Sequence, residues 1–177
     1  MSNNVERLFF ALWPNHKIGQ SLTEAYAGVT ELAGQGRIME PSNLHITLHF
    51  LGNTPVDRIA CFIDSAHKIE SPSFELEINH LGYFERPGVS WLGPVEIPEA
   101  LLQLQRLLGE KIKHCKFEPE LRPYRPHVTM ARKVKQSVTI DQTKPICWKV
   151  DSFTLVQSVG QGASVKYHVK NTFPLNL

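Results

Sequence analysis

Alternating apolar and polar positions divide the chain into short strands separated by amphipathic helices. Apolar residues recur every three or four positions over 15–32 and again over 98–112, which predicts two helices. A third helix is predicted over 54–69, because Thr54 and Pro55 suit a helix cap and first turn. Strands are predicted over 6–13, 44–50, 74–78, 89–92, 127–130 and 153–156, with a last one beginning at 167.

The same order of elements occurs twice along the chain. Strand, helix, proline-containing loop, His-x-Thr strand and further strand follow one another in each half, and 82 positions separate His45 from His127. This regularity predicts one two-lobed domain over 1–177, built from two related units at about 6–80 and 89–173. The expected class is α+β, with two pseudo-symmetric lobes of mainly antiparallel sheet, helices outside and a cleft between the lobes.

Each His-x-Thr strand carries its polar residues on one face. Residues i and i+2 share a face of a strand, so His127 lies beside Thr129, and His45 beside Thr47 and His49. The opposite faces are apolar and are expected to enter a core: Leu44, Ile46, Leu48 and Phe50 in the first strand, Val128 and Met130 in the second.

These faces have a purely structural interpretation, since histidine and threonine are ordinary residues on the wet side of a half-buried strand. Their double occurrence in matching units favours function instead. We expect no metal and no cofactor, because His45 and His49 lie about 13 Å apart along an ideal strand and neither motif holds a carboxylate. A serine-hydrolase elbow, Gly-x-Ser-x-Gly, is also absent from the sequence.

Two histidines without a metal suit paired acid–base catalysis. Near neutral pH one imidazole can accept a proton while the other donates one. The hydroxyls of Thr47 and Thr129 can donate hydrogen bonds to an oxygen that gains negative charge. Phosphodiester cleavage, with one proton taken and one given, matches this set of groups.

Charge is concentrated in one segment of the chain. The whole chain carries a net charge of only +2, whereas residues 106–135 hold nine basic and three acidic residues, a net +6. A local positive field attracts phosphates. A solvated helix face followed by a basic loop would give the same pattern.

The cysteines and the hydropathy of the chain restrict the class of protein further. Cys61, Cys115 and Cys147 are odd in number, far apart and without CxxC spacing, so we expect neither a disulfide framework nor a thiolate zinc site. The chain contains no apolar run near the roughly 18 residues that span a bilayer. Its beginning lacks the pattern of a signal peptide, so a cytoplasmic protein without membrane contact is expected.

Together these residues resemble the two-histidine phosphoesterase superfamily and, within it, bacterial RNA 2′,3′-cyclic phosphodiesterases, also known as 2′-5′ RNA ligases. The likeness covers nearly the whole chain. It is carried by RLFFA at 7–11, NLHITL at 43–48, FLG at 50–52, WLG at 91–93 and PHVTMAR at 126–132.

The resemblance implies a cleft enzyme that opens 2′,3′-cyclic phosphates at RNA or oligonucleotide ends to 2′-phosphates, without metal. It assigns His127 as the base and His45 as the acid, a polarity that the sequence does not fix. Thr47 and Thr129 would hold the non-bridging oxygens, and Arg132 would pair with the phosphate. In the reverse direction a 5′-hydroxyl replaces water and a 2′-5′ linkage forms without ATP.

Strict alternation places Arg132 on the core side of its strand, so the strand must end or twist near Ala131. His49 is expected at the rim of the cleft. Aromatic candidates for base stacking, which the sequence does not rank, are Phe9, Phe10, Tyr124 and Trp91.

The expected partners are RNA ends, tRNA fragments among them, and no obligate protein partner is evident. Two other functions stay open. The chain could act on a small nucleotide or ADP-ribose cyclic phosphate, or it could bind nucleotides or RNA without catalysis.

Overall fold

The computed structural model of the chain describes residues 4–29, 36–136, 138–140, 143–160 and 165–176. Within these ranges lie three α-helices, two 3₁₀ turns and ten strands. The helices and turns are α1 (His16–Ala27), η1 (Pro41–Asn43), α2 (Val56–Ala66), α3 (Glu99–Ile112) and η2 (Lys113–Cys115). The strands are β1 (Val5–Leu12), β2 (Arg37–Ile38), β3 (Ile46–Pro55), β4 (Phe74–Ile78), β5 (His80–Phe84), β6 (Val89–Gly93), β7 (Val128–Arg132), β8 (Ile146–Val150), β9 (Ser152–Val159) and β10 (Lys166–Pro174).

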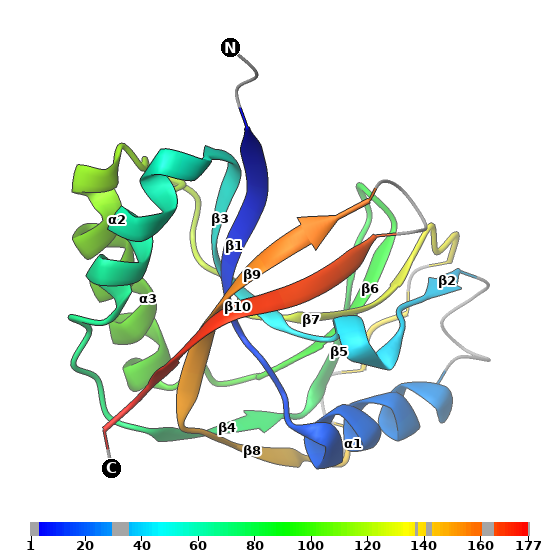
Figure 1. The fold of residues 1–177 in the computed structure, drawn as a ribbon. Coiled ribbons are helices and arrows are strands. Elements are labelled where there is room, and N and C mark those ends of the chain that lie inside the picture. The colour runs from blue at the N-terminus through cyan, green and yellow to red at the C-terminus, as the bar shows by residue number, and fades with distance from the viewer. Residues whose placement is uncertain (1–3, 30–35, 137, 141–142, 161–164, 177) are drawn as a thin grey trace.

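Eight of these strands form one sheet, and the pairs named here are all antiparallel. The strand order is β10-β9-β1-β3-β7-β6-β5, with β2 paired to β7, while β4 and β8 form a separate two-stranded sheet (Figure 1). The predicted α+β class with mainly antiparallel sheet is thereby confirmed. Strand β9, from the second predicted unit, pairs with β1 from the first, and β10 lies beyond β9; the division into units at 6–80 and 89–173 stays a prediction.

Helices α2 and α3 lie together on one side of the main sheet (Figure 1). The face that α3 turns inward is set by apolar residues spaced three or four positions apart, since Leu101, Leu104, Leu108 and Ile112 are completely buried. Burial of these side chains from water is the main force that holds the helix on the sheet. Among the described residues, no helix is both long and apolar enough to cross a bilayer.

The predicted helix over 15–32 is present as α1, which begins after Asn15. The Asn15 side chain accepts a hydrogen bond from the Ile18 backbone N–H at 3.0 Å, which satisfies one of the free donors of the first turn. Residues 30–32 of that prediction lie outside the described residues. Strands β2, β5 and β8 were not predicted: β2 has only two residues, and the sequences of β5 (HLGYF) and β8 (ICWKV) do not alternate regularly between apolar and polar residues.

The expectation that the chain has no disulfide is wrong. Cys61 on α2 and Cys115 at the end of η2 are bonded, with their Cα atoms 5.8 Å apart. The two cysteines are 54 residues apart in sequence, and only the packing of α2 against η2 brings them together. Spacing along the chain therefore carries no sign of this bond.

We expect Leu104→Ala to lower the free energy of unfolding by about 2–5 kcal/mol, because the truncated side chain leaves a cavity under α3. Urea denaturation followed by circular dichroism measures this loss. Arg106→Ala, on the exposed face of the same helix, is the control and is expected to change the free energy of unfolding by less than about 0.5 kcal/mol. Equal losses in both variants would contradict the assignment of the buried face.

Candidate active site

The two His-x-Thr motifs meet where β3 pairs with β7. The pairing is antiparallel and sets Ile46 opposite Val128. This register places His45 opposite Thr129, and Thr47 opposite His127, on the face away from the core. Directly opposed residues of such a pair have Cβ atoms about 4.5–5.5 Å apart. Each imidazole therefore faces the hydroxyl of the other motif.

Both histidines are held in the same way. His45 Nδ1 lies 2.7 Å from the carbonyl oxygen of Asn43, and His127 Nδ1 lies 2.7 Å from that of Arg125. A carbonyl only accepts, so in each ring Nδ1 carries the hydrogen and donates it. Nε2 of the neutral ring is thus left as the proton acceptor in both motifs.

Each motif strand carries a β-bulge at the same place. In β3, Thr47 and His49 pair with the consecutive residues Ala11 and Phe10, which leaves Leu48 as the extra residue. In β7, Thr129 and Ala131 pair with Trp91 and Ser90, which leaves Met130 as the extra residue. In both strands the extra residue immediately follows the threonine. A bulge interrupts the strict alternation of faces, so residues beyond it change sides.

The bulges explain why the predictions for His49 and Phe50 were wrong and how Arg132 can leave the core side of its strand. His49 is not at the rim: it is only 6% exposed, and its Nε2 donates to the Gln105 carbonyl at 2.7 Å. Phe50 is not a core residue: it is 56% exposed. Arg132 is freed from the core side and is partly exposed, as the resemblance required. Phe50 and Arg132 stand at the same position relative to their histidines.

Aromatic rings surround both imidazoles. The ring of His45 stacks on Trp13 at 5° with centroids 5.4 Å apart, and its other neighbours are Phe9 at 4.8 Å and Tyr167 at 5.1 Å. His127 has Phe84 edge-on at 5.0 Å. Such packing fixes the orientation of each ring and excludes part of the surrounding water.

The second histidine has a further aromatic neighbour, Trp91, with ring centroids 5.9 Å apart. The indole ring of Trp91 lies against the backbone of β5, where a Cβ on Gly82 would come within 2.1 Å of it. Any larger residue at Gly82 would displace Trp91. Gly82 is therefore required to hold the Trp91 ring in its place beside His127.

Burial shifts the pKa of both histidines in the same direction. It lowers the pKa of His45 from 6.5 to about 4; the hydrogen bond to Asn43 opposes this shift, while His127 and Arg132 lower the pKa further. Burial also lowers the pKa of His127, and the positive charges of Arg132 and Arg122 add to that effect. Both imidazoles are therefore neutral near pH 7 when nothing is bound.

Two hollows lined by arginines flank the motifs. One has a volume of about 500 Å³ and is lined by residues that include Arg7, Arg37, Arg132, Phe9 and Tyr167; we call it the Arg37 hollow. The other, of about 460 Å³, is lined by residues that include Arg86, Arg122, Arg125, Phe84, Thr47 and His127; we call it the Arg122 hollow. Phe50 lines both of them.

The structure brings all five predicted site residues to this region of the sheet. Thr47 and His127 line the Arg122 hollow, Arg132 lines the Arg37 hollow, and His45 and Thr129 are partly exposed at the strand pair between them. The positive charge of Arg132, and that of His127 when it is protonated, lower the pKa of His45.

Of the four unranked aromatic candidates, Phe10 is excluded, because it is fully buried and packs on Phe153 and Phe173. Phe9 and Trp91 pack against the histidines, and Tyr124 donates from its hydroxyl to the Thr47 carbonyl at 3.1 Å. Trp13, Tyr167, Phe84 and, apart from Arg132, the arginines of the hollows were not predicted as site residues from the sequence. Trp13 could have been found, since it shares the alternating face of Phe9.

Residues 23–162 of the chain match the model of a protein family described as the 2′-5′ RNA ligase superfamily. The chain belongs to this superfamily. The predicted family is therefore confirmed.

Two curated relatives are both named RNA 2′,3′-cyclic phosphodiesterase. The Escherichia coli protein is 32% identical over 136 residues, which cover 76% of this chain and 76% of the relative. The Thermus thermophilus protein is 28% identical over 184 residues, which cover 96% of this chain and 90% of the relative.

The fold agrees with solved structures over almost its full length. E. coli LigT complexed with 3′-AMP superposes with a TM-score of 0.87 at 28% identity, covering 98% of this chain and 100% of that chain. The apo form of LigT gives a TM-score of 0.85 at 29% identity, with 98% of this chain and 99% of that chain covered.

We expect the imidazole of His45 to stay neutral on acidification until pH approaches 4, and that of His127 to become protonated below pH 6.5. NMR titration of the ring resonances measures both. Arg132→Gln removes a positive charge that acts on both rings and should raise both pKa values.

Arg122→Gln is the matched comparison, because the Arg122 charge acts on His127 and is not among the causes that shift His45. It should raise the pKa of His127 alone. Equal responses of the two rings to Arg122→Gln would contradict the placement of these charges.

Proposed function

We propose that this protein hydrolyses 2′,3′-cyclic phosphates at RNA or oligonucleotide ends to 2′-phosphates. The observation that carries this proposal is the pair of imidazoles at one strand pair, each with Nδ1 tied to a backbone carbonyl and a threonine of the other motif opposite. Membership of the 2′-5′ RNA ligase superfamily supports the substrate class, as do relatives named RNA 2′,3′-cyclic phosphodiesterase.

In the proposed reaction, Nε2 of His127 takes a proton from water, and the water oxygen attacks the phosphorus. The bond from phosphorus to O3′ breaks, and Nε2 of His45 gives a proton to O3′, which leaves as a hydroxyl. The phosphate stays on O2′. Replacing water by a 5′-hydroxyl, with each histidine in the same role, gives a 2′-5′ linkage.

The other predicted site residues act on the phosphate oxygens. Thr47 and Thr129 donate hydrogen bonds to non-bridging oxygens, which gain charge in the transition state. Arg132, brought to the cleft face by the bulge at Met130, pairs with the same phosphate. These donors stand on adjacent strands of one sheet, which holds them at fixed positions.

The lowered pKa of His45 fits this scheme once substrate is included. A free imidazole with a pKa of about 4 is seldom protonated at neutral pH. The negative charge of a bound phosphate favours the protonated ring and so raises that pKa. Substrate binding therefore lets His45 take up from solvent the proton that it later gives to O3′.

RNA is the substrate that the flanking hollows favour. The phosphodiester backbone carries one negative charge per nucleotide, and the Arg37 and Arg122 hollows each present three arginines beside aromatic rings. Single-stranded nucleic acid is held by this combination of stacking and charge. A small cyclic nucleotide would occupy one hollow only. Fragments of tRNA and a cytoplasmic location stay predictions.

We expect a short RNA ending in a 2′,3′-cyclic phosphate to be converted to the 2′-phosphate, with equal rates in EDTA. Phosphorus NMR of the product identifies the position of the phosphate. His45→Ala and His127→Ala should each lower kcat/KM at least about 10²-fold. Thr47→Val and Thr129→Val should cost less, since each removes one neutral donor.

His16→Ala, which changes an exposed histidine at the start of α1, is the matched control and should keep full activity. Faster turnover of an ADP-ribose cyclic phosphate or of a small cyclic nucleotide would contradict the RNA assignment. Tight RNA binding without turnover would show a binding module instead.

A substrate with sulfur in place of O3′ tests the polarity of the two histidines. A thiolate leaves without a proton, so the variant that lacks the acid should regain activity. We expect this substrate to restore His45→Ala at least about tenfold more than His127→Ala. The reverse order of rescue would exchange the two roles.

A further inference from the structure

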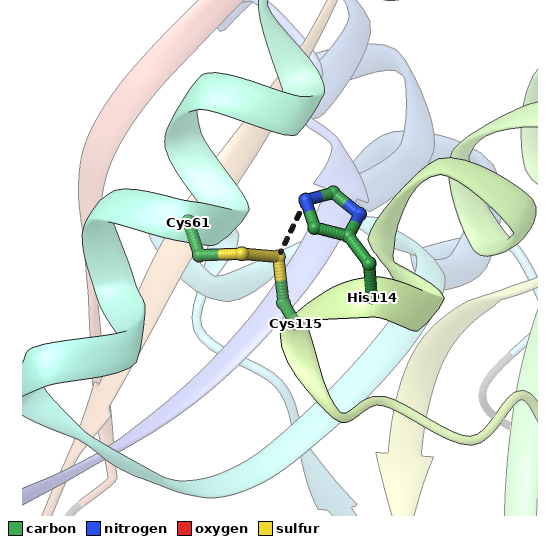
Figure 2. A group of neighbouring side chains, drawn as sticks. All are labelled: Cys61, His114 and Cys115. Atoms are coloured by element: carbon green, nitrogen blue, oxygen red, sulfur yellow. Dashed lines mark hydrogen bonds between the residues drawn. A yellow bond between two sulfur atoms is a disulfide. The ribbon is translucent and has the colours of Figure 1, made fainter.

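A second cluster of reactive side chains lies outside the two hollows. Cys61 of α2 and Cys115 of η2 form a disulfide, and the imidazole of His114 lies beside it (Figure 2). None of the three lines either hollow. We propose that Cys61 and Cys115 are a redox-active pair that alternates between disulfide and dithiol, and that His114 carries the proton of Cys115 during this exchange.

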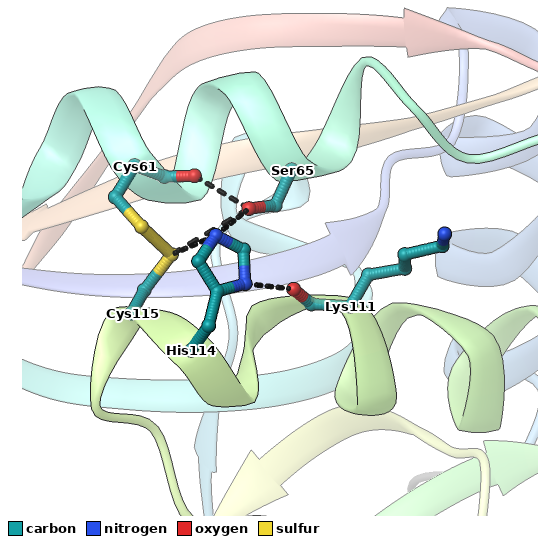
Figure 3. Close-up of a disulfide and its surroundings, with 5 residues drawn as sticks. All are labelled: Cys61, Ser65, Lys111, His114 and Cys115. Atoms are coloured by element: carbon teal, nitrogen blue, oxygen red, sulfur yellow. Dashed lines mark hydrogen bonds between the residues drawn. A yellow bond between two sulfur atoms is a disulfide. The ribbon is translucent and has the colours of Figure 1, made fainter.

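The orientation of the His114 ring supports the proton transfer. Its Nδ1 lies 2.8 Å from the carbonyl oxygen of Lys111 and donates to it (Figure 3). Nε2 is directed at the sulfur of Cys115, 3.7 Å away. In the reduced pair this nitrogen can take the thiol proton, and the resulting imidazolium stabilises the thiolate.

Ser65 completes the surroundings of the sulfur. Its hydroxyl is 2.7 Å from the carbonyl oxygen of Cys61 and donates to it. Because its hydrogen is used there, the oxygen offers lone pairs toward His114 Nε2, 3.5 Å away. A protonated His114 would therefore find an acceptor in Ser65 as well as in the thiolate of Cys115.

The two sulfurs differ in access. Cys115 is only 3% exposed, whereas Cys61 is partly exposed and His114 is exposed. A thiolate from solution therefore reaches the sulfur of Cys61 first. Cys115 is then the leaving thiolate, and a stabilised thiolate leaves faster.

The exchange needs an external reductant, for which we name a dithiol. Its first thiolate bonds to the sulfur of Cys61, and the electron pair of the disulfide passes to Cys115, which takes a proton from His114. The second thiol of the reductant then displaces Cys61 as a thiol. Two electrons and two protons reach the cysteines, and the dithiol becomes a disulfide.

The fold accommodates both states of the pair. Helices α2 and α3 contact each other and share one apolar core, with Ile59 and Phe62 of α2 and Leu108 and Ile112 of α3 all buried. This packing holds the two helices together when the bond is open. The exchange therefore needs no rearrangement of the sheet.

Opening or closing the Cys61–Cys115 disulfide can also affect the candidate active site. Cys115 ends η2, and the loop that follows supplies Phe117, Arg122 and Tyr124 to the Arg122 hollow. Opening the disulfide frees the beginning of this loop from α2. We therefore expect a changed KM for RNA, an effect that rests on the proposed function.

The exchange itself is tested without any substrate. The oxidised Cys147→Ser protein, which lacks the exposed free cysteine, is incubated with dithiothreitol, and new thiols are alkylated and located by peptide mass spectrometry. We expect reversible reduction of Cys61 and Cys115 and, with glutathione, a mixed disulfide on Cys61. His114→Ala should slow reduction about three- to tenfold, whereas His16→Ala should not change it.

Three results would overturn the proposed exchange. They are free thiols at both positions in the oxidised protein, a mixed disulfide on Cys115, or equal rates of disulfide reduction in the proteins with and without His114→Ala. Zinc held by the three side chains, found as one ion per chain that blocks alkylation, would show a metal site instead.

The effect of the disulfide on the candidate active site is tested by a separate measurement. Oxidised and reduced Cys147→Ser proteins should differ at least about threefold in KM for the cyclic-phosphate RNA, with kcat changed less. An equal KM in both redox states would refute the link to the loop. Failure of the proposed function would look different, as no turnover in either state.

Discussion

The antiparallel pairing of β3 with β7 at Ile46 and Val128 is the constraint on which the candidate active site depends. Both residues are completely buried, so their side chains fix which face of each strand turns outward. A slip of one residue would turn the two histidines inward and expose apolar side chains. The hydrophobic core therefore sets the register, and the register sets which imidazole faces which hydroxyl.

Burial then determines the chemistry that these groups can perform. The aromatic walls around His45 keep water away, which favours the uncharged ring, while the Asn43 carbonyl determines which nitrogen carries the hydrogen. The same arrangement repeats around His127 with different residues. Each ring is thus prepared by the fold to accept a proton at Nε2. The arginines nearby provide the charge that draws an anion to it.

Much of this could be read from the sequence, because the relevant signals are local. Alternation within a strand placed His45 with Thr47 and His127 with Thr129, and the repeat of elements suggested that the two motifs act together. The α+β class followed from strands and helices of ordinary length. Apart from the repeat, these inferences use residues within a few positions of one another.

The parts that were missed depend on contacts between distant segments. The bulges at Leu48 and Met130 are visible only in the pairing with β1 and β6, so the sides taken by His49 and Phe50 were predicted wrongly. Tyr167 joins the His45 wall from the last strand, and the bond from Cys61 to Cys115 depends on helix packing. No local pattern encodes such neighbours.

The matching bulges have a consequence for how this sequence can vary. Each adds one residue between a threonine and the outward side chain three positions further on, so that side chain faces outward only while the extra residue stays out of the regular pairing. Regular pairing through Met130, without the bulge, would turn the guanidinium of Arg132 into the core, where an unpaired charge is strongly destabilising. Loss of Met130, by contrast, would leave Arg132 two positions after Thr129 and on the same outward face.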